Sequence, residues 1–269
     1  MSAGLHVEAM GAGPPLVLLH GWAMHSGMWG SVAERLAGRF RVHAVDLPGH
    51  GYSAALAPWT LDGVVGAVAA AFAGDDEPLA VVGWSLGGVV ALRWALAAPQ
   101  RIGRLALVCT TPSFVARSGW PDAMAAATLA QFGDELRVAY RLTLLRFLSL
   151  QLRGGDDAKA TLAAMRARIF ARPDPEPGVL AAALAELAAI DLRAAAPQLR
   201  QPALVVAGER DTLAPAAAGA WLARAMPHAR FAPIAGAAHA PHLSHPAAFA
   251  AALDDFLDDP PTPAPARAG

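Results

Sequence analysis

A serine at position 85 stands in a setting that suits a nucleophile. Residues 83–87 are Gly-Trp-Ser-Leu-Gly, a G-x-S-x-G pattern that follows an apolar run and opens a helical pattern. In this motif the serine occupies a sharp strand-to-helix turn with its hydroxyl exposed. Glycines flank it because a side chain there would collide with the neighbouring backbone. We interpret Ser85 as a nucleophile, and the alternative is a glycine-rich turn that only packs.

A serine hydroxyl needs a neighbouring base, and the base needs a carboxylate to hold it. With a serine of this kind, the acid follows in the chain and the histidine comes last. Asp211 lies on the loop that leaves the apolar run 203–208, so we assign it as the acid. Glu209, which is closer to that run, is the alternative acid. For Asp211 itself the alternative role is to cap the next helix.

Three histidines compete for the role of base. His239 follows a run of small residues that lets a loop pass close to the site, so we assign it as the base. His242 and His245 lie nearer the closing helix, where capping and surface roles are ordinary. A metal site built from these three is disfavoured, because no acidic or cysteine ligand accompanies them at metal-site spacing.

Two backbone N–H groups are placed to bind an oxyanion. Trp22 follows a His-Gly pair at the end of the apolar run 16–19, and Leu86 begins the helix whose positive end stabilises negative charge. The alternative for Trp22 is an ordinary loop with a packed indole. These residues predict ester hydrolysis through an acyl-enzyme, without a cofactor or a metal. Activity is expected to fall on acidification as His239 is protonated.

Alternating elements must position these residues. Apolar runs that predict strands alternate with helical patterns until residue 109, and the alternation resumes at residue 203. This order predicts an α/β protein with a mostly parallel central sheet, helices on both faces and an inserted helical cap. We predict a core of 1–112 and 198–258, a cap of 113–197 and a disordered tail of 259–269. The strands are expected at 16–19, 41–46, 79–82, 105–109, 203–208 and 230–234, and the cap helices at 124–132, 135–153, 158–170 and 178–190.

Composition limits the class of protein. A formal net charge of −1 argues against binding nucleic acid through bulk positive charge. No apolar run is long enough to span a membrane and no leader pattern opens the chain, so we expect a cytoplasmic monomer without a membrane partner. Cys109, the single cysteine, lies in an apolar run and is expected to be a buried structural thiol. Asp46 and His50 are expected to hold a turn and not to catalyse.

The motifs at 20–22, 46–51 and 83–88, with the loops of Asp211 and His239, resemble those of the α/β-hydrolase superfamily over nearly the whole chain. Segments 18–22, 83–88, 146–151 and 237–246 are similar to those of the pimeloyl-[acyl-carrier protein] methyl ester esterases of biotin synthesis. This resemblance implies demethylation of a pimeloyl methyl ester on acyl carrier protein, with release of methanol. It implies that the acyl site is lined by Trp22, Ser85, Leu86, Phe147, Leu148, Ser149, Leu150, Gln151 and His239.

The same resemblance implies that basic cap residues dock the acidic carrier. The candidates are Arg146, Arg141, Arg153 and Lys159, with Arg166 and Arg168 nearby. Their alternative role is a solvated helix face. Acidic residues at 156–157 and a lysine at 159 depart from the basic pattern of that family. The competing functions are a broader esterase, lactonase or thioesterase with the same catalytic residues, and a non-hydrolytic small-molecule receptor on the same fold.

Overall fold

The computed structural model of the protein describes residues 4–151 and 158–259. Its centre is a seven-stranded sheet in the order β1-β3-β2-β4-β5-β6-β7. β1 pairs antiparallel with β3, and the other neighbours are parallel. The strands are β1 (Val7–Met10), β2 (Pro15–Leu19), β3 (Arg41–Val45), β4 (Leu79–Trp84), β5 (Ile102–Val108), β6 (Ala203–Gly208) and β7 (Ala229–Ile234).

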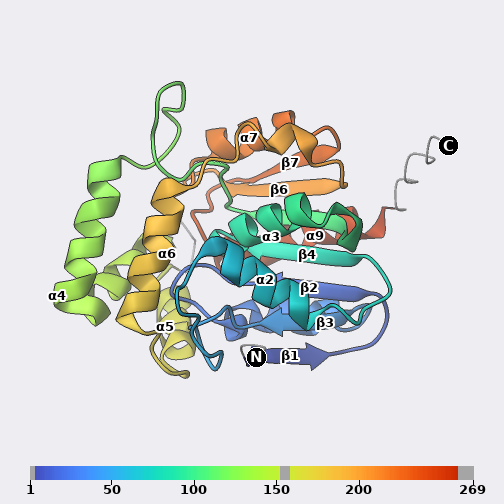
Figure 1. Ribbon diagram of the computed structural model, residues 1–269, viewed down its shortest axis with the longest axis horizontal. Helices are drawn as coiled ribbons and strands as arrows, with labels where there is room; N and C mark the ends of the chain where they lie inside the picture. The colour runs from blue at the N-terminus through green and yellow to red at the C-terminus, as the bar shows by residue number, and fades with distance from the viewer. Residues whose placement is uncertain (1–3, 152–157, 260–269) are drawn as a thin grey trace.

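Helices cover both faces of the sheet. In Figure 1, α2 and α3 lie on the face turned to the viewer and α9 lies behind the sheet. The central strands β2 and β6 are buried along their whole length, because a parallel strand packed on both faces must be apolar throughout. The helices of the core are α1 (Gly30–Leu36), α2 (Leu61–Ala71), α3 (Leu86–Ala97), α7 (Ala216–Ala225), α8 (Pro241–Ser244) and α9 (Pro246–Asp258). The predicted fold class is confirmed.

Three further helices lie between β5 and β6 in the chain. They are α4 (Ala126–Gln151), α5 (Ala158–Ile169) and α6 (Pro177–Ala189), and Figure 1 shows them together beside one end of the sheet. We call residues 113–197 the cap, and its boundaries stay a prediction. The predicted tail, apart from its first residue, lies outside the described part of the chain. No described helix has the length and apolar character needed to cross a membrane.

The helix pattern of the cap differs from the expectation in one place. Two helices, 124–132 and 135–153, were expected with a break near Gly133. The element α4 does consist of two helices, but they meet at a kink at Ala139. The backbone leaves helical geometry at Ala139, with φ −144° and ψ 59°. A glycine inside a helix costs only about 1 kcal/mol relative to alanine, so Gly133 can continue the helix where packing supports it.

An arginine of the cap is inserted into the core. Arg172, between α5 and α6, donates to both carboxylate oxygens of Asp46, at 2.9 and 2.7 Å, and to Ser26 Oγ at 2.8 Å. It also pairs with Glu8. The side chain of Asp46 is fully buried and that of Arg172 is 9 % exposed. This ion pair therefore ties the cap to the turn after β3.

The turn after β3 is held by Asp46, as predicted. Its carboxylate accepts the backbone N–H of Ser26 at 2.7 Å and of Tyr52 at 2.9 Å. Burial opposes its charge, but the coulombic interaction with His20, these N–H groups and Arg172 together hold the pKa of Asp46 below its ordinary value. Asp46 is thus a structural anion, outside the chemistry.

Two more polar contacts join the core to the second half of the cap. Trp22 Nε1 donates to the backbone oxygen of Leu180 at 3.1 Å, on the first turn of α6. His25 Nε2 donates to the backbone oxygen of Arg168 at 2.9 Å, at the end of α5. The cap is consequently anchored at three points between Arg168 and Leu180.

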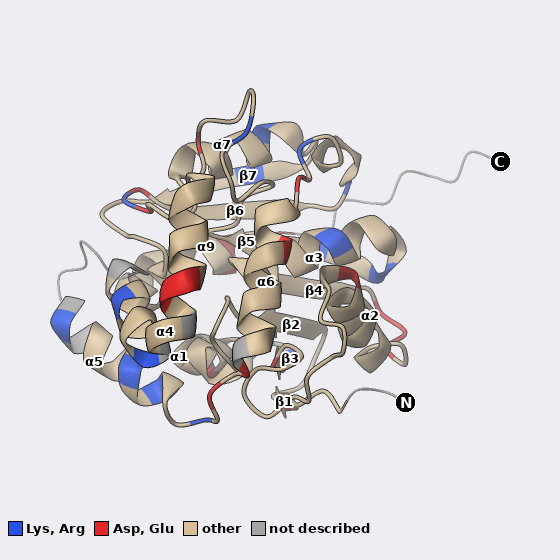
Figure 2. Ribbon diagram, turned by 60° about the vertical axis from the view of Figure 1, so that its left-hand side comes forward, with Lys and Arg blue, Asp and Glu red and all other residues tan. Residues whose placement is uncertain are grey.

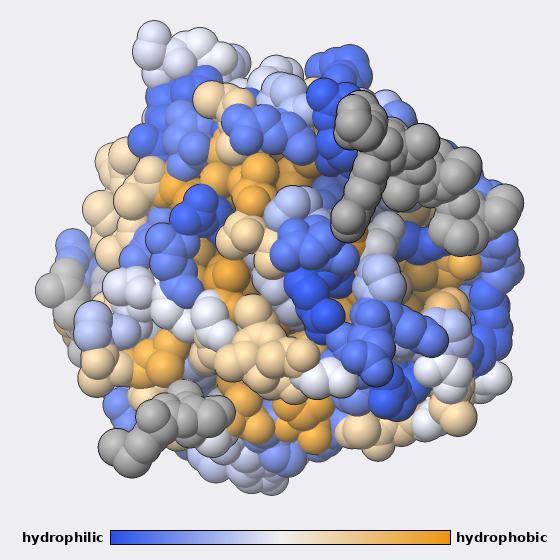
Figure 3. All heavy atoms as spheres, turned by 45° about the vertical axis from the view of Figure 1, so that its right-hand side comes forward, coloured by the Kyte–Doolittle hydropathy of each residue, from blue (hydrophilic) through white to orange (hydrophobic). Residues whose placement is uncertain are grey.

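The surface is mixed in polarity. Figure 3 shows one face on which hydrophilic residues separate the hydrophobic ones into small areas. The large hydrophobic side chains most exposed among the described residues are Tyr52, Val138 and Leu142. Val138 and Leu142 lie on either side of the kink of α4 at Ala139, so the cap exposes one apolar side chain from each part of this element.

Candidate active site

Ser85 occupies a strained turn between β4 and α3. Its φ of 54° and ψ of −112° are rare for a residue with a side chain. A Cβ atom on Gly83 would lie 2.4 Å from the oxygen of Gly87, and one on Gly87 would lie 2.2 Å from the oxygen of Leu19. Both positions therefore require glycine, because the neighbouring backbone leaves no room for a Cβ atom. This is the reason inferred from the sequence.

The predicted acid and base lie in direct contact. His239 Nδ1 and Asp211 Oδ2 are 2.7 Å apart, and both side chains are buried. The other carboxylate oxygen of Asp211 accepts the backbone N–H of Leu213 at 2.8 Å and of Ala214 at 3.0 Å. The carboxylate thus fixes the imidazole with Nδ1 as the donor, which leaves Nε2 to act as a base.

Glu209, the alternative acid, points elsewhere. Its carboxylate accepts the backbone N–H of Gly236 at 2.9 Å, and the residue is exposed. This contact joins the two loops that carry Asp211 and His239. Glu209 supports the loop geometry and does not reach the imidazole.

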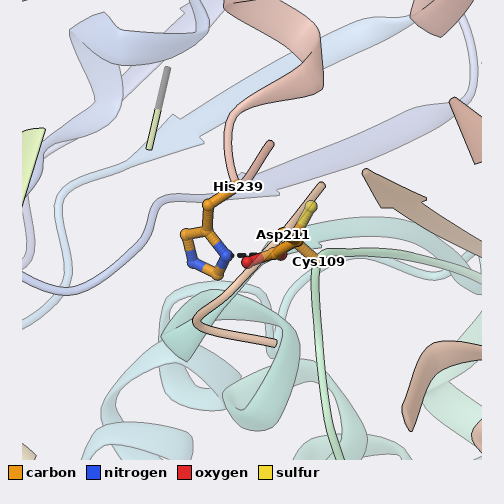
Figure 4. A group of neighbouring side chains, drawn as sticks. All are labelled: Cys109, Asp211 and His239. Atoms are coloured by element: carbon orange, nitrogen blue, oxygen red, sulfur yellow. Dashed lines mark hydrogen bonds and ion pairs between the residues drawn. The ribbon is translucent and has the colours of Figure 1, made fainter. Parts of the chain in front are cut away.

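Ser85 and His239 face the same cavity. Both line a pocket of about 380 Å³, and in Figure 4 the second ring nitrogen of His239 points away from Asp211. Within the described residues no hydrogen bond joins Ser85 Oγ to the imidazole. Such contacts are often long in a free enzyme and shorten when substrate binds.

The N–H groups assigned to the oxyanion are unoccupied. In the described part of the chain, neither Trp22 N nor Leu86 N donates a hydrogen bond. The loop before Trp22 is held by His20, whose Nδ1 donates to the oxygen of Gly21 at 2.8 Å while Nε2 accepts the N–H of Leu47 at 2.9 Å. Burial lowers the pKa of His20 to about 3, so this neutral tautomer persists at neutral pH.

The pocket wall is mostly apolar. Trp22, Ser85, Phe147 and His239, all expected from the sequence, lie on it. Sequence reasoning missed the rest of the lining, although Thr128, Leu129 and Phe132 have the three-to-four spacing of one helix face. The lining residues that were missed are Phe114, Ala123, Met124, Ala125, Thr128, Leu129, Phe132, Leu184, Leu187, Thr212 and Leu213.

The run 146–151 does not face the pocket as a block. Phe147 lies on the wall, Leu148 is buried away from it, and Ser149 is exposed with its Oγ donating to the oxygen of Arg146 at 2.7 Å. Successive residues of a helix are turned by about 100°, so three neighbours cannot share one face. The side chains of Leu150 and Gln151 lie outside the described residues, as does Arg153.

The other two candidate histidines have separate surroundings. His242 is buried against Trp84 and Trp29, with ring centroids 4.6 and 4.9 Å away. His245 Nδ1 lies 2.9 Å from Ser244 Oγ. Neither contact joins the pair of Asp211 and His239.

We expect His242→Phe to raise the free energy of unfolding at pH 7 by about 1–3 kcal/mol. Neither ring nitrogen of His242 has a hydrogen-bond partner in the described structure, and an unsatisfied buried polar group costs about that much. A phenyl ring fills the same aromatic site without this cost. Urea denaturation measures the change, and exposed His228→Phe is the control. Equal or lower stability of the His242 variant contradicts the expectation.

The same substitution, His242→Phe, should make the free energy of unfolding less sensitive to acid. Burial, with smaller effects of His239 and Arg168, lowers the pKa of His242 from 6.5 to about 3. The folded state holds His242 neutral, whereas the unfolded chain protonates it near pH 6.5. The free energy of unfolding is therefore unaffected by this group above pH 6.5 and declines as the pH falls towards 3. Below pH 6 the phenylalanine variant should therefore lose stability less steeply than the parent protein.

Comparisons with known proteins agree with this geometry. The sequence profile of the alpha/beta hydrolase fold family matches residues 14–246. The chain is 45% identical over 252 residues to a pimeloyl-[acyl-carrier protein] methyl ester esterase of Nitrosomonas europaea, covering 94% of this chain and 99% of that protein. It is also 45% identical over 258 residues to the protein of that name from Xanthomonas oryzae pv. oryzae, covering 96% and 100%.

Solved structures show the same fold. An esterase from Exiguobacterium antarcticum superposes with a TM-score of 0.89 at 20% identity, covering 96% of this chain and 98% of that one. An esterase from Rhodococcus superposes with a TM-score of 0.79 at 29% identity, covering 95% and 94%. On the family profile and the full-length relatives together, the chain belongs to the α/β-hydrolase fold family and, within it, to the pimeloyl-[acyl-carrier protein] methyl ester esterases.

Proposed function

We propose that this protein is a serine carboxylesterase that hydrolyses the methyl ester of a pimeloyl group carried on acyl carrier protein, the biotin-pathway step that the resemblance implies. The observation that carries the chemistry is the buried pair of His239 and Asp211, whose Nδ1 and Oδ2 atoms are 2.7 Å apart. His239 lines the same pocket as Ser85. The substrate follows from the relatives that are 45% identical over their full length.

Ser85, His239 and Asp211 act as nucleophile, base and acid in this proposal. His239 Nε2 takes the proton of Ser85 Oγ as this oxygen attacks the ester carbonyl, and Asp211 stabilises the imidazolium. The N–H groups of Trp22 and Leu86 hold the oxyanion. When the tetrahedral intermediate collapses, His239 protonates the leaving methoxide and methanol departs. Water then attacks the acyl-enzyme by the same steps, which frees the carboxylic acid and regenerates Ser85.

The pocket suits the acyl chain of this substrate. The wall away from Ser85 and His239 is formed by apolar side chains of α4 and α6, among them Phe132, Phe147 and Leu184. A methylene chain gains free energy by leaving water for such a wall. Among the described residues that line the pocket there is no arginine, lysine or carboxylate, so this lining favours the neutral ester over the charged acid that hydrolysis produces.

The carrier is proposed to bind the basic side of the cap. Figure 2 shows Lys and Arg gathered on and beside α5. Lys159 and Arg146 are exposed there, and Arg146 lies 3.8 Å from Glu135. Arg141 is paired with Asp174 at 2.9 Å. The two exposed apolar side chains of α4 lie in the same part of the sequence, so the cap offers an acidic carrier both charge and apolar surface.

We expect Arg146→Glu to raise KM for the carrier-bound methyl ester about tenfold and to leave KM for the carrier-free ester unchanged. Reversal of one charge repels an acidic partner but does not alter the pocket, and the effect should shrink as salt screens it. Methanol release is the measurement. Arg200→Glu, an exposed charge before β6, is the matched control. If KM for the carrier-bound ester changed no more than KM for the carrier-free ester, the carrier would not bind at Arg146.

The assay of the two esters also separates the competing functions. A pimeloyl-carrier esterase hydrolyses the carrier-bound ester with the higher kcat/KM. A broader esterase prefers the free esters or shows no difference. A receptor binds ester without releasing methanol. Growth of a biotin-requiring strain that lacks its own demethylase gives a second, independent measure of the pathway role.

A further inference from the structure

Trp84, the last residue of β4, connects the turn of the nucleophile to the loop of the base. Its side chain is buried, and its Nε1–H donates to the backbone oxygen of His239 at 2.7 Å. The two residues are 155 positions apart in the chain. Because Ser85 follows Trp84 directly, this hydrogen bond links the backbone that carries the nucleophile to the backbone that carries the imidazole.

Burial alone does not account for this hydrogen bond. A buried indole N–H usually finds an acceptor. However, Trp29 and Trp94 are each 1% exposed, as Trp84 is, and their Nε1 atoms have no partner in the described structure. In the same part of the chain, no backbone N–H donates to the oxygen of His239. The indole is therefore the donor that the described structure provides for this oxygen.

The indole is itself held in place by packing. A Cβ atom on Gly21, the residue before Trp22, would lie 3.3 Å from two ring carbons of Trp84. The indole also lies against His242, with the ring centroids 4.6 Å apart. Movement of the N–H away from the oxygen of His239 would disturb these contacts, so the donor has a fixed position.

The imidazole needs such a second point of attachment. Asp211 holds its Nδ1 at 2.7 Å, but one hydrogen bond leaves a ring free to pivot about that contact. Within the described residues no hydrogen bond joins Ser85 Oγ to the imidazole, so these two groups do not align each other. A displacement of about 1 Å in a reacting group can cost about 100-fold in rate. A contact that fixes His239 relative to Ser85 therefore bears on the rate.

We propose that Trp84 is a positioning residue: its indole N–H holds the backbone of His239 in a fixed place relative to Ser85, which keeps the imidazole aligned for proton transfer. This inference rests on the proposed function, because Trp84 acts through the base. Among the described residues, Trp84 does not line the pocket. Its loss should therefore lower kcat and leave KM for the ester nearly unchanged.

The test removes the indole N–H in two ways. Trp84→Phe keeps an aromatic ring of smaller size. A second variant carries 3-benzothienylalanine at position 84, which keeps the shape of the indole with sulfur in place of the N–H. In both, kcat for the carrier-free methyl ester, measured as methanol release, should fall about ten- to a hundredfold, with KM within about threefold of the parent protein. The downfield proton NMR signal of His239 Nδ1–H should broaden, because a less fixed loop lets this proton exchange faster with water.

Two other tryptophans provide matched controls. Trp59 Nε1 donates to the backbone oxygen of Pro48 at 2.9 Å, in a buried contact outside the described lining of the pocket. Trp59→Phe loses the same kind of hydrogen bond, so it should lower the melting temperature while kcat and the NMR signal stay unchanged. Trp94→Phe loses no hydrogen bond and should also leave kcat and the signal unchanged.

The outcomes separate positioning from packing and from the proposed function. A kcat and an NMR signal like those of the parent protein in the benzothienylalanine variant overturn the inference, even if Trp84→Phe is impaired, because ring packing then explains the loss. Equal losses of kcat in Trp59→Phe and Trp84→Phe overturn it as well. If Ser85→Ala still releases methanol from this ester, the proposed function fails, and the NMR signal still judges Trp84.

Discussion

Replacing Ser85 by alanine is expected to lower kcat for ester hydrolysis by about 10⁴-fold or more. The alanine removes the atom that forms the acyl-enzyme, while the oxyanion donors and the pocket still give a small residual rate. Alanine and serine share the Cβ atom and tolerate the φ of 54° alike, so the fold should persist. Release of p-nitrophenol from a short ester measures the loss, and an unchanged melting temperature excludes unfolding.

Companion variants make this expectation sharper. His239→Ala should cost about as much as Ser85→Ala, and the double variant should cost no more than either, because residues that act as one unit are not additive. Asp211→Asn keeps the shape but changes the hydrogen bond to Nδ1, which should cost about 10⁴-fold. Activity within tenfold of the parent protein in Ser85→Ala would show that the nucleophile is a different residue.

Replacing Arg172 by methionine is expected to lower the free energy of unfolding by about 3–5 kcal/mol. The methionine fills much of the same volume but leaves the buried carboxylate of Asp46 without its cation, and an uncompensated buried charge costs about this much. Urea denaturation at pH 7 measures the loss. The deficit relative to the parent protein should shrink as the pH falls, because protonation of Asp46 removes its uncompensated charge.

Arg141→Met is the matched control for this change. Arg141 also pairs with an aspartate of the cap, Asp174, but its side chain is 71 % exposed. Exposed pairs contribute about 0–1 kcal/mol, so the control should stay close to the parent protein. Arg172→Lys, which keeps the charge but loses the two-point contact, should fall between them. A loss below 1 kcal/mol in Arg172→Met would mean that water or a neighbour compensates Asp46.

The chemistry could be predicted from the sequence because its signals are local. Each of Ser85, Asp211 and His239 follows a strand that the sequence predicts, and the carboxyl ends of parallel strands meet at one edge of a sheet. The edge strand β1 was missed for the opposite reason. Its residues are half-buried or exposed, and its antiparallel pairing with β3 depends on a partner more than 30 residues away.

The remaining features depend on contacts between distant segments. The burial of Cys109 was predicted and is confirmed, but its approach to Asp211 joins residues about 100 positions apart. Arg172 and Asp46 are 126 positions apart, and no local pattern relates them. The break in α4 at Ala139 has no glycine or proline to mark it. Tertiary packing decides such points, and propensity is a weak guide to them.

The distribution of anchors in the cap has a consequence for evolution. Three polar ties to the core lie between Arg168 and Leu180, whereas α4 places the rings of Phe132 and Phe147 against Trp22. Apolar contacts tolerate exchange of one hydrophobic side chain for another of similar volume. Substrate preference can therefore diversify through substitutions in α4 alone. The ion pair of Arg172 and Asp46 would keep the cap of each such variant in the same place on the core.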